Sequence, residues 1–310
     1  MREYLEMLYE KRDKTDIYLK SDTELISKLI QKLIQKFGSV KSFAEDLKVD
    51  ESTVRRWKRS GIIPLSLLKK LIKNSEFRDE VNNIKQNTKW LSVPSSPNKV
   101  KIPEMNPDIA YIVGYISGDG HIRNPTKSGD KWEIIVESWS DSNILKMINK
   151  IVSKNFGIRG NLHKNTTRKG WRLFISSKIF HRILTRLFKI PVGEKYSRVR
   201  VPQIIKNANE KIRQAYIQGW FDAEGFVTYS HNKPQIEFFI KNRSVTKWIK
   251  QQLENFGIKV YQNKRGTLII RYRQIDNFCS FIGFRHSTQL KKLADSMASG
   301  NTRAPSGGHD

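Results

Sequence analysis

Two short stretches of the sequence place an acid in the same surroundings. Tyr111–Gly120 reads YIVGYISGDG and Tyr216–Gly225 reads YIQGWFDAEG, so Asp119 and Glu224 lie 105 positions apart and each precedes a glycine. Two carboxylates held close together repel each other, and a divalent cation such as Mg²⁺ offsets that repulsion. Mg²⁺ on carboxylates also binds phosphate oxygens and water, which is what hydrolysis of a phosphodiester requires. If the fold brings the acids together, they predict a metal site for phosphodiester hydrolysis.

The small residues around these acids indicate which elements position them. Gly114 and Gly118 lie four positions apart, as do Gly219 and Ala223 in the second stretch. On a helix this spacing puts both small residues on one face, where a second helix backbone can approach closely. We therefore expect two helices that pack against each other and end in the two acids. The glycine after each acid is expected to adopt the left-handed conformation that ends a helix.

The segments that follow the two stretches repeat each other. In each, two strand-like segments, a helix, two more strand-like segments and a further helix follow, and both inner helices end in Asn-Phe-Gly-Ile. An internal repeat of about 105 residues indicates two similar domains related by a pseudo-twofold axis. We predict an α+β fold with αββαββα units at residues 103–202 and 203–294. Residues 75–102, rich in Asn, Ser, Pro and Lys, are interpreted as a basic linker and residues 295–310 as a disordered tail.

The charge of the chain indicates its partner. The formal net charge is +27 and the pI about 10.1, and such an excess attracts polyanions, of which nucleic acid is the expected one. No apolar run approaches the ~20 residues needed to cross a bilayer, and the charged N-terminal segment lacks the form of a signal peptide. Cys279 is the only cysteine, which excludes an internal disulfide and fits a reducing compartment. We expect an intracellular protein, in the cytoplasm or on the nucleoid, that binds no membrane.

Residues 1–74, interpreted as a small all-α domain, contain a candidate for DNA binding. One short helix, a turn at Lys48–Asp50 and a second short helix with Val54 and Trp57 inward follow one another. This order resembles the phage-repressor type of helix-turn-helix, with Ala44 as the small residue where the two helices touch. The outward residues of the second helix are expected to contact DNA; they are Thr53, Arg55, Arg56 and Lys58. An ordinary small helical bundle with a basic face is the alternative.

The two acid-bearing stretches also resemble a known family. Ile112–Gly120 (IVGYISGDG) and Ile217–Gly225 (IQGWFDAEG) look like the two LAGLIDADG motifs of a single-chain homing endonuclease, and the resemblance extends over roughly residues 103–293. It implies curved sheets that saddle the DNA major groove. It also implies site-specific double-strand cleavage that depends on a divalent metal, Mg²⁺ or Mn²⁺. By this resemblance Asp119 and Glu224 are the catalytic metal ligands.

Supporting residues follow from the same resemblance. The family often keeps a basic residue near each active site, where it steadies the water network or the charged transition state. This points to Lys195 in the first unit, although a surface lysine that contacts phosphate is an equally good interpretation. In the second unit it points to Lys291, with Lys292 and Gln289 as rivals. Base readout is expected from alternate strand residues that face the DNA, although many of them will contact phosphates instead. The candidates are His121, Arg123, Asn124, Lys131, Lys164, Arg168, Arg172, Tyr229, His231, Gln235, Lys264, Arg271 and Arg273.

The departures from the family pattern leave the acids intact. Ser117 replaces the first Asp of the first motif, while Asp222 keeps it in the second. That position is usually not the metal ligand, so the retained acids favour an endonuclease that acts as a monomer on double-stranded DNA. One alternative is a DNA-binding regulator that does not cleave. Another is an RNA-splicing maturase that holds intron RNA on the same scaffold.

Overall fold

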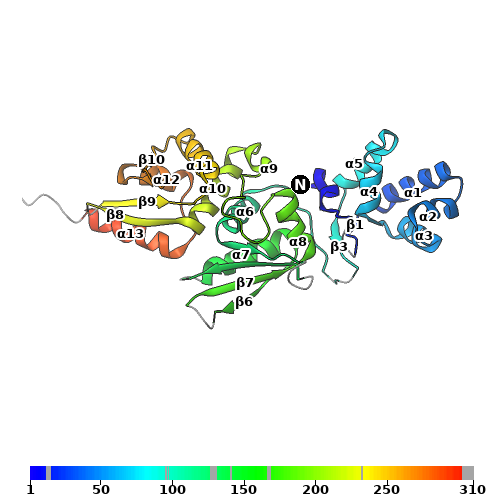
Figure 1. Ribbon diagram of the computed structural model, residues 1–310, viewed down its shortest axis with the longest axis horizontal. Helices are drawn as coiled ribbons and strands as arrows, with labels where there is room; N and C mark the ends of the chain where they lie inside the picture. The colour runs from blue at the N-terminus through cyan, green and yellow to red at the C-terminus, as the bar shows by residue number, and fades with distance from the viewer. Residues whose placement is uncertain are drawn as a thin grey trace, which may run out of the picture. The chain divides into compact units, whose positions relative to one another are not determined.

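A computed structural model of the chain divides into two compact units (Figure 1). Unit 1 contains residues 1–104, 153–158 and 177–187, and unit 2 contains the rest of the chain. The structure describes residues 1–11, 15–94, 96, 98–125, 131–139, 142–165, 169–231 and 233–301, with side chains as far as 296.

Unit 1 is mostly helical and carries a small sheet. Its first elements are η1 (Arg2–Leu8), β1 (Tyr18–Lys20), α1 (Thr23–Phe37), α2 (Val40–Leu47), α3 (Glu51–Ser60), β2 (Ile62–Pro64), α4 (Leu65–Leu71), η2 (Ser75–Phe77), α5 (Arg78–Gln86) and β3 (Trp90–Ser92). Helix α1 begins at a cap in which the Asp22 carboxylate accepts hydrogen bonds from two backbone N–H groups, and it ends at Gly38, whose φ is 79°. Its apolar stripe, which includes Leu29, is buried in the core of the unit.

The sheet of unit 1 and its helix α5 correct two expectations. The strands pair in the order β2-β1-β3, with Leu19 opposite both Ile63 and Leu91, and all three side chains are fully buried. The N-terminal region is therefore not all-α. Residues 75–102, expected to form a linker, instead contain α5 and β3. They fold because Val81 and Ile84 of α5 are fully buried in the same core.

Part of the first predicted repeat belongs to unit 1. Helix α8 (Lys178–Arg182) continues into the π-helical segment η3 (Ile183–Leu187). The carboxylate of Glu10 forms ion pairs with Arg182, at 3.6 Å, and with Arg186. The Lys178 ammonium donates to the Thr15 carbonyl at 2.5 Å. The first segment of unit 1 ends at residue 104, next to the boundary expected at residue 103, but residues 153–158 and 177–187 of the first repeat also belong to this unit.

Unit 2 holds most of the repeated architecture. The first repeat runs α6 (Pro107–Asp119), β4 (Gly120–Ile122), β5 (Glu133–Ser138), α7 (Ser142–Phe156), β6 (Asn161–Lys164) and β7 (Trp171–Ser176), before α8. After α9 (Gln203–Lys206), the second runs α10 (Glu210–Glu224), β8 (Gly225–Ser230), β9 (Lys233–Phe238), α11 (Arg243–Asn255), β10 (Tyr261–Gln262), β11 (Leu268–Ile270), η4 (Tyr272–Gln274) and α12 (Ile275–Phe281). The antiparallel sheets have matching orders, β4-β5-β7-β6 and β8-β9-β11-β10. The predicted α+β fold with two αββαββα repeats is confirmed.

The C-terminal segment differs from the prediction. Residues 295–301, expected to begin a disordered tail, belong to helix α13 (Ser287–Asn301). Leu293 is buried in this helix, and Gln289 near its start contacts β8. The rest of the expected tail lies outside the described residues. The burial of Leu293 and the contact of Gln289 with β8 thus hold α13 against unit 2, and the helix continues past the predicted boundary at residue 294.

Candidate active site and nucleic-acid interface

Helices α6 and α10 touch through their backbones (Figure 1). A Cβ atom added at Gly114 would lie 2.1 Å from the carbonyl oxygen of Tyr216, and one added at Gly219 would lie 2.1 Å from that of Tyr111. The two contacts are reciprocal, since each glycine of one repeat faces the corresponding tyrosine of the other. Only glycine permits this approach, because the neighbouring atom is backbone and cannot rotate away.

The same contact continues to the acidic ends of the two helices. A Cβ at Gly118 would lie 2.5 Å from the Ala223 Cβ and 3.5 Å from Oε1 of Glu224. The carboxylate of Glu224 therefore lies beside the residue that precedes Asp119. All four predicted interface residues are found at this contact, and it brings the two acids to one place.

The surroundings of the acids disfavour their negative charge. Both residues end a helix, where the helix dipole opposes an anion. Loss of hydration, and after it the charge of Glu224, raises the pKa of Asp119 to about 8. The Asp119 side chain remains exposed, so we attribute this shift to crowding by protein atoms and to the second acid rather than to enclosure in the core. Burial raises the pKa of Glu224. A cation at this place would therefore be stabilised.

The glycine after each acid is not left-handed, contrary to the prediction. Gly120 has φ −82° and ψ 147°, and Gly225 has φ −93° and ψ 152°, so both are extended. Their role is spatial, because a Cβ at Gly120 would lie 2.6 Å from Cγ2 of Ile116 and one at Gly225 2.6 Å from the carbonyl oxygen of Phe221. Each helix consequently passes directly into a strand, β4 or β8, and the acid is fixed at the junction.

A buried lysine lies next to the acids. Lys195 is 9% exposed, and its ammonium donates to the carbonyl of Ile116 at 2.9 Å and to that of Gly120. Burial lowers the pKa of Lys195 to about 8, while the charges of Asp119 and Glu224 oppose this shift. The lysine predicted for the first repeat is thus placed at the end of α6, against its last carbonyls and within the field of both acids.

The second repeat has no lysine in an equivalent place among the described contacts. Lys291 is exposed on α13, and no contact joins it to the acids within the described part of the chain. The side-chain oxygen of Gln289, a rival residue, accepts a hydrogen bond from the backbone N–H of Val227 at 3.1 Å. Val227 follows Glu224 by three positions in the chain, so the amide is anchored at the start of β8.

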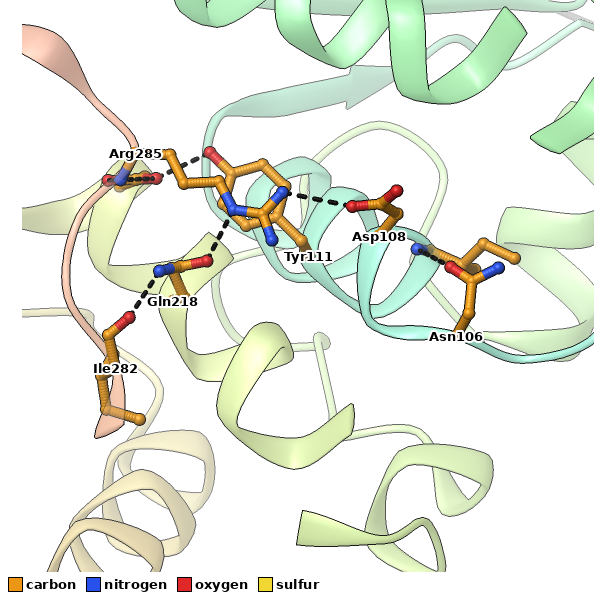
Figure 2. Close-up of polar contacts among 8 residues, drawn as sticks. Asn106, Asp108, Tyr111, Gln218, Ile282 and Arg285 are labelled. Atoms are coloured by element: carbon orange, nitrogen blue, oxygen red, sulfur yellow. Dashed lines mark hydrogen bonds and ion pairs between the residues drawn. The ribbon is translucent and has the colours of Figure 1, made fainter. Parts of the chain in front are cut away.

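A polar network that joins α6, α10 and the segment before α13 was not expected from the sequence (Figure 2). The Arg285 guanidinium donates to Gln218 of α10 at 2.7 Å and to Asp108 of α6 at 3.4 Å, and it lies 4.3 Å from the centre of the Tyr111 ring. Asp222 accepts hydrogen bonds from the Tyr111 hydroxyl at 2.7 Å and from the backbone N–H of Arg285 at 3.0 Å. The segment before α13 therefore ties both motif helices together. No sequence pattern indicates this network, since Arg285 lies more than 60 positions from its partners.

The exposed face of the first sheet is mixed in charge. The register places His121, Ile135 and Phe174 side by side on the face that does not pack against the core. The predicted Arg123 and Arg172 form ion pairs with two glutamates of β5, Glu133 at 3.0 Å and Glu137 at 2.6 Å. These acids were missed, although their spacing of four positions in EIIVES puts both on one face of a strand and could have indicated them.

Other candidates of the first repeat are distributed differently. Lys164 pairs with Trp171 in register, which assigns it to the opposite face of the sheet from Arg172, although it is exposed at the strand end. Lys131 is exposed before β5, and Asn124 is half-buried after β4. Arg168 lies outside the described residues.

The second sheet gathers several candidates in one groove. A groove of about 930 Å³ is lined by His231, Gln235, Arg271 and Arg273, among others. Sequence reasoning missed two exposed tyrosines of this groove: the Arg271 guanidinium lies 5.0 Å from the centre of one ring, and the Lys233 ammonium 5.9 Å from that of the other. These are Tyr261 and Tyr272, and the alternation of aromatic and basic residues in KVYQNKRGTLIIRYR was the available signal.

Two candidates of the second repeat lie elsewhere. Tyr229 is exposed but pairs with Pro234, so it is on the opposite face from Gln235, which pairs with Thr228. Lys264 lies in the turn between β10 and β11, away from the residues that line this groove.

In unit 1, a short turn at residues 48–50 joins α2 to α3, the two helices interpreted above as a helix-turn-helix. The turn contains Lys48 in the left-handed region, with φ 55°, and the N–H of Val49 donates to the Ala44 carbonyl at 3.0 Å. Val54 and Trp57 of α3 are buried against the rest of the unit. Of the candidate DNA contacts, Arg55 and Arg56 are exposed on the side of α3 away from Val54 and Trp57. Thr53 and Lys58 flank the buried face and are half-buried.

One family profile matches the repeated part of the chain. A profile described as LAGLIDADG-like domain matches residues 106–187 and 211–283, which together make half of the chain. The chain is 31% identical over 134 residues to the homing endonuclease I-ApeI of Aeropyrum pernix, which covers 41% of this chain and 60% of I-ApeI.

Two other relatives are much longer than the chain. It is 25% identical over 211 residues to a glutamine–fructose-6-phosphate aminotransferase of Methanocaldococcus jannaschii, covering 63% of this chain and 18% of the relative. It is 27% identical over 293 residues to a probable translation initiation factor IF-2 of Thermococcus kodakarensis, covering 94% of this chain and 23% of the relative. The chain thus spans less than two thirds of each curated relative.

Among solved structures, the chain resembles a mesophilic variant of the homing endonuclease I-DmoI, with a TM-score of 0.44 and 18% identity over 57% of this chain and 95% of that chain. It also resembles the homing endonuclease I-WcaI bound to its DNA recognition sequence, with a TM-score of 0.40 and 16% identity over 57% of this chain and 81% of that chain. Within the described part of the chain, no helix has the length and apolar character to cross a membrane.

Proposed function

Because the chain belongs to the LAGLIDADG family, we propose that it is a site-specific DNA endonuclease in which Asp119 and Glu224 hold a divalent metal at the scissile phosphodiester. The observation that carries this proposal is the contact between α6 and α10, which places both carboxylates at one junction. Both acids come from one chain, so the proposed active form is a monomer. The similarity to I-ApeI, a homing endonuclease, is consistent with this assignment.

The acids fit Mg²⁺ or Mn²⁺. Both side chains have raised pKa values, which means that their charges are poorly compensated by the protein alone. No group of three or more His, Cys, Asp or Glu side chains suited to a metal occurs among the described residues. Two carboxylates therefore leave most coordination positions to water and phosphate, which is how Mg²⁺ is usually held at phosphoryl sites. When bound, the metal would supply an activated water and stabilise the leaving oxygen.

The residues around the acids have separate tasks in this proposal. Asp119 and Glu224 would hold the metal between the two repeats. Lys195, held by two helix carbonyls, places a positive charge where negative charge develops on the phosphate. Its lowered pKa, about 8, also allows it to hold or release a proton near neutral pH. Gln289 anchors the start of β8 and so holds Glu224 at its junction.

The exposed strand faces are the proposed surface for the DNA duplex. The groove lined by Gln235 and Arg271 offers amide and guanidinium groups of the kind that read adenine and guanine in the major groove. Arg123 and Arg172 are held by glutamates in the free protein, and we propose that they exchange these partners for DNA. In the same way, we propose that α3 contacts DNA through Arg55 and its neighbours, which extends the recognised site.

A cleavage assay tests the proposal. The substrate is the DNA that surrounds the gene for this chain, with the gene removed, in Mg²⁺ or in EDTA. We expect double-strand cleavage at one place in Mg²⁺ only, lost in Asp119→Asn and in Glu224→Gln. Asp276→Asn serves as the control, because it removes an exposed acid of α12 that lies outside the site. A second readout is calorimetric binding of Mn²⁺ to the protein alone, which the two active-site variants should weaken.

The same experiment separates the other two functions that the sequence leaves open. Tight, specific binding without any cleavage would support a DNA-binding regulator and contradict the endonuclease. Preference for structured intron RNA over the duplex would support a maturase. Mn²⁺ binding that is unchanged by both active-site substitutions would refute the assignment of the acids, whatever the activity.

A further inference from the structure

A second groove in unit 2 lies apart from the proposed duplex surface. It measures about 1050 Å³ and runs between α11, the segment before it and the turn at residues 263–266. We name it the α11 groove; its lining includes Phe239, Lys241, Arg243, Lys247, Lys264 and Arg265. It shares no residue with the groove lined by Gln235 and Arg271.

The positive charge in the α11 groove is largely uncompensated. Glu254 is the one acid among its lining residues, and it forms an ion pair with Lys250 at 3.8 Å. The other five basic side chains of the groove have no ion-pair partner in the described part of the chain. In unit 1, by contrast, surface lysines such as Lys32 and Lys70 are paired with acids. Unpaired cations along a concave surface repel one another and attract a polyanion.

The groove also offers groups that can contact nucleobases. Phe239 is 41% exposed although it is a large apolar side chain, and it lies among the cations of the groove. The amides of Gln251, Gln262 and Asn263 line the same space. Cations that follow a backbone, together with an aromatic ring on which a base can stack, are the features that proteins use to bind single strands. The bases of a duplex are already stacked, so they would leave the Phe239 ring without a partner.

We propose that the α11 groove binds a single-stranded segment of nucleic acid. The phosphates lie along Lys247 and Lys264 on the two walls, and one base stacks on Phe239. This site includes neither acid and shares no lining residue with the groove of Gln235 and Arg271, and it requires no metal. Its existence therefore does not depend on the endonuclease activity proposed above.

Binding of labelled 15-mers, oligo(dT) and oligo(U), to the full chain in EDTA tests the proposal. The groove variant carries Lys247→Glu and Lys264→Glu. The control carries Lys206→Glu and Lys211→Glu, an equal change of charge at exposed positions of α9 and at the start of α10, the end opposite Glu224. We expect at least a tenfold loss of affinity in the groove variant and less than a twofold loss in the control. The dependence of log K on log salt should become less steep by about 1.4 in the groove variant, since each phosphate contact on a single strand contributes about 0.7.

A second variant tests the stacking contact. Phe239→Ala should weaken binding at least fivefold with an unchanged salt dependence, because it removes no charge. Phe281→Ala is the control, since Phe281 is also 41% exposed but lies on α12 outside the groove. The tighter of the two oligonucleotides identifies the source of the strand as DNA or RNA.

Three results would overturn the proposal. The first is wild-type affinity of the groove variant for both oligonucleotides. The second is the absence of any loss in Phe239→Ala. The third is a duplex of unrelated sequence that competes for the protein as well as the single strands do, and whose affinity falls by the same factor as theirs in the groove variant and in Phe239→Ala. Cleavage measured in parallel would report on the acids alone, so failure of one proposal does not imply failure of the other.

Discussion

Substitution of Gly114 by alanine tests the contact on which the active site depends. The added Cβ would lie 2.1 Å from the carbonyl oxygen of Tyr216, whereas ordinary van der Waals contact begins at 3.4 Å. Both atoms are fixed to helix backbones, so a change of rotamer cannot relieve the overlap. Helices α6 and α10 would have to separate locally by the difference, 1.3 Å.

The size of the effect follows from two opposing terms. Overpacking of a dense core costs about 1–3 kcal/mol, and a clash between backbones belongs at the upper end. Replacing a helical glycine with alanine stabilises the helix by about 1 kcal/mol. We therefore expect Gly114→Ala to lower the free energy of unfolding by about 2 kcal/mol. In a unit of this size that corresponds to a fall of roughly 4–8 °C in the thermal midpoint.

A methyl exchange one turn along the helix provides the matched control. In Gly118→Ala the new Cβ would lie 2.5 Å from the Cβ of Ala223, which is itself removable. The double variant Gly118→Ala with Ala223→Gly moves one methyl group from α10 to α6 and leaves the sum of helix propensities unchanged. Urea unfolding should show a loss in Gly118→Ala that Ala223→Gly largely restores. No such partner exists for Gly114, because the obstacle there is a carbonyl.

The reasoning is refuted if Gly114→Ala unfolds at the wild-type urea concentration or above it. That result would mean that the higher helix propensity of alanine alone determines the change in the free energy of unfolding, and that the two helices do not touch at this glycine. A failure of Ala223→Gly to restore Gly118→Ala would contradict the neighbour assigned to Gly118. In either case the acids would lose the contact that brings them together.

Three further predictions concern the groups around this contact. Without metal, the raised pKa of Asp119 means that its carboxyl keeps a proton in the folded state that the unfolded chain releases near pH 4. The free energy of unfolding should therefore fall as the pH rises from about 4 towards 8. Thermal midpoints measured at low and high pH should show this fall, and Asp119→Asn should reduce it. Arg285→Ala should cost about 1–2 kcal/mol in urea unfolding, because it removes two hydrogen bonds and a stacked guanidinium that join α6 to α10, and Arg285→Lys should recover only part. Lys195→Met should slow single-turnover cleavage ~10²-fold while the chain stays folded and still binds the duplex, and wild-type cleavage in this variant would exclude a role for the buried charge.

The packing of the two motif helices could be predicted because the close approach of two helices requires a recognisable sequence pattern. A backbone contact requires small residues at fixed spacing, and this is visible at Gly114 and Gly219 without any structure. The conformation of Gly120 could not be predicted in the same way. Glycine serves both where φ is positive and where a Cβ has no room, and only the position of Ile116 decides between the two.

The small sheet of unit 1 had no comparable signal. Its strands are three residues long, too short for an alternating pattern, and β3 lies in a polar segment after α5. Leu19 meets Ile63 and Leu91 across more than 40 positions of chain in each case. Pairing at such separations depends on the packed tertiary structure rather than on local sequence.

The two repeats keep the same helix contact and differ in what surrounds the acids. Gly114 and Gly219 make reciprocal contacts, and neither can change without moving a backbone. The groups beyond the helices are free of this constraint, and here the repeats diverge: one supplies a buried lysine, Lys195, and the other the amide of Gln289. The charge of Lys195 opposes the rise in pKa of both acids, so it acts on the pair and not on its own repeat alone. In the proposed function the two carboxylates therefore form one shared centre beside the buried Lys195, and a duplex bound across it would present its two strands to chemically different sides.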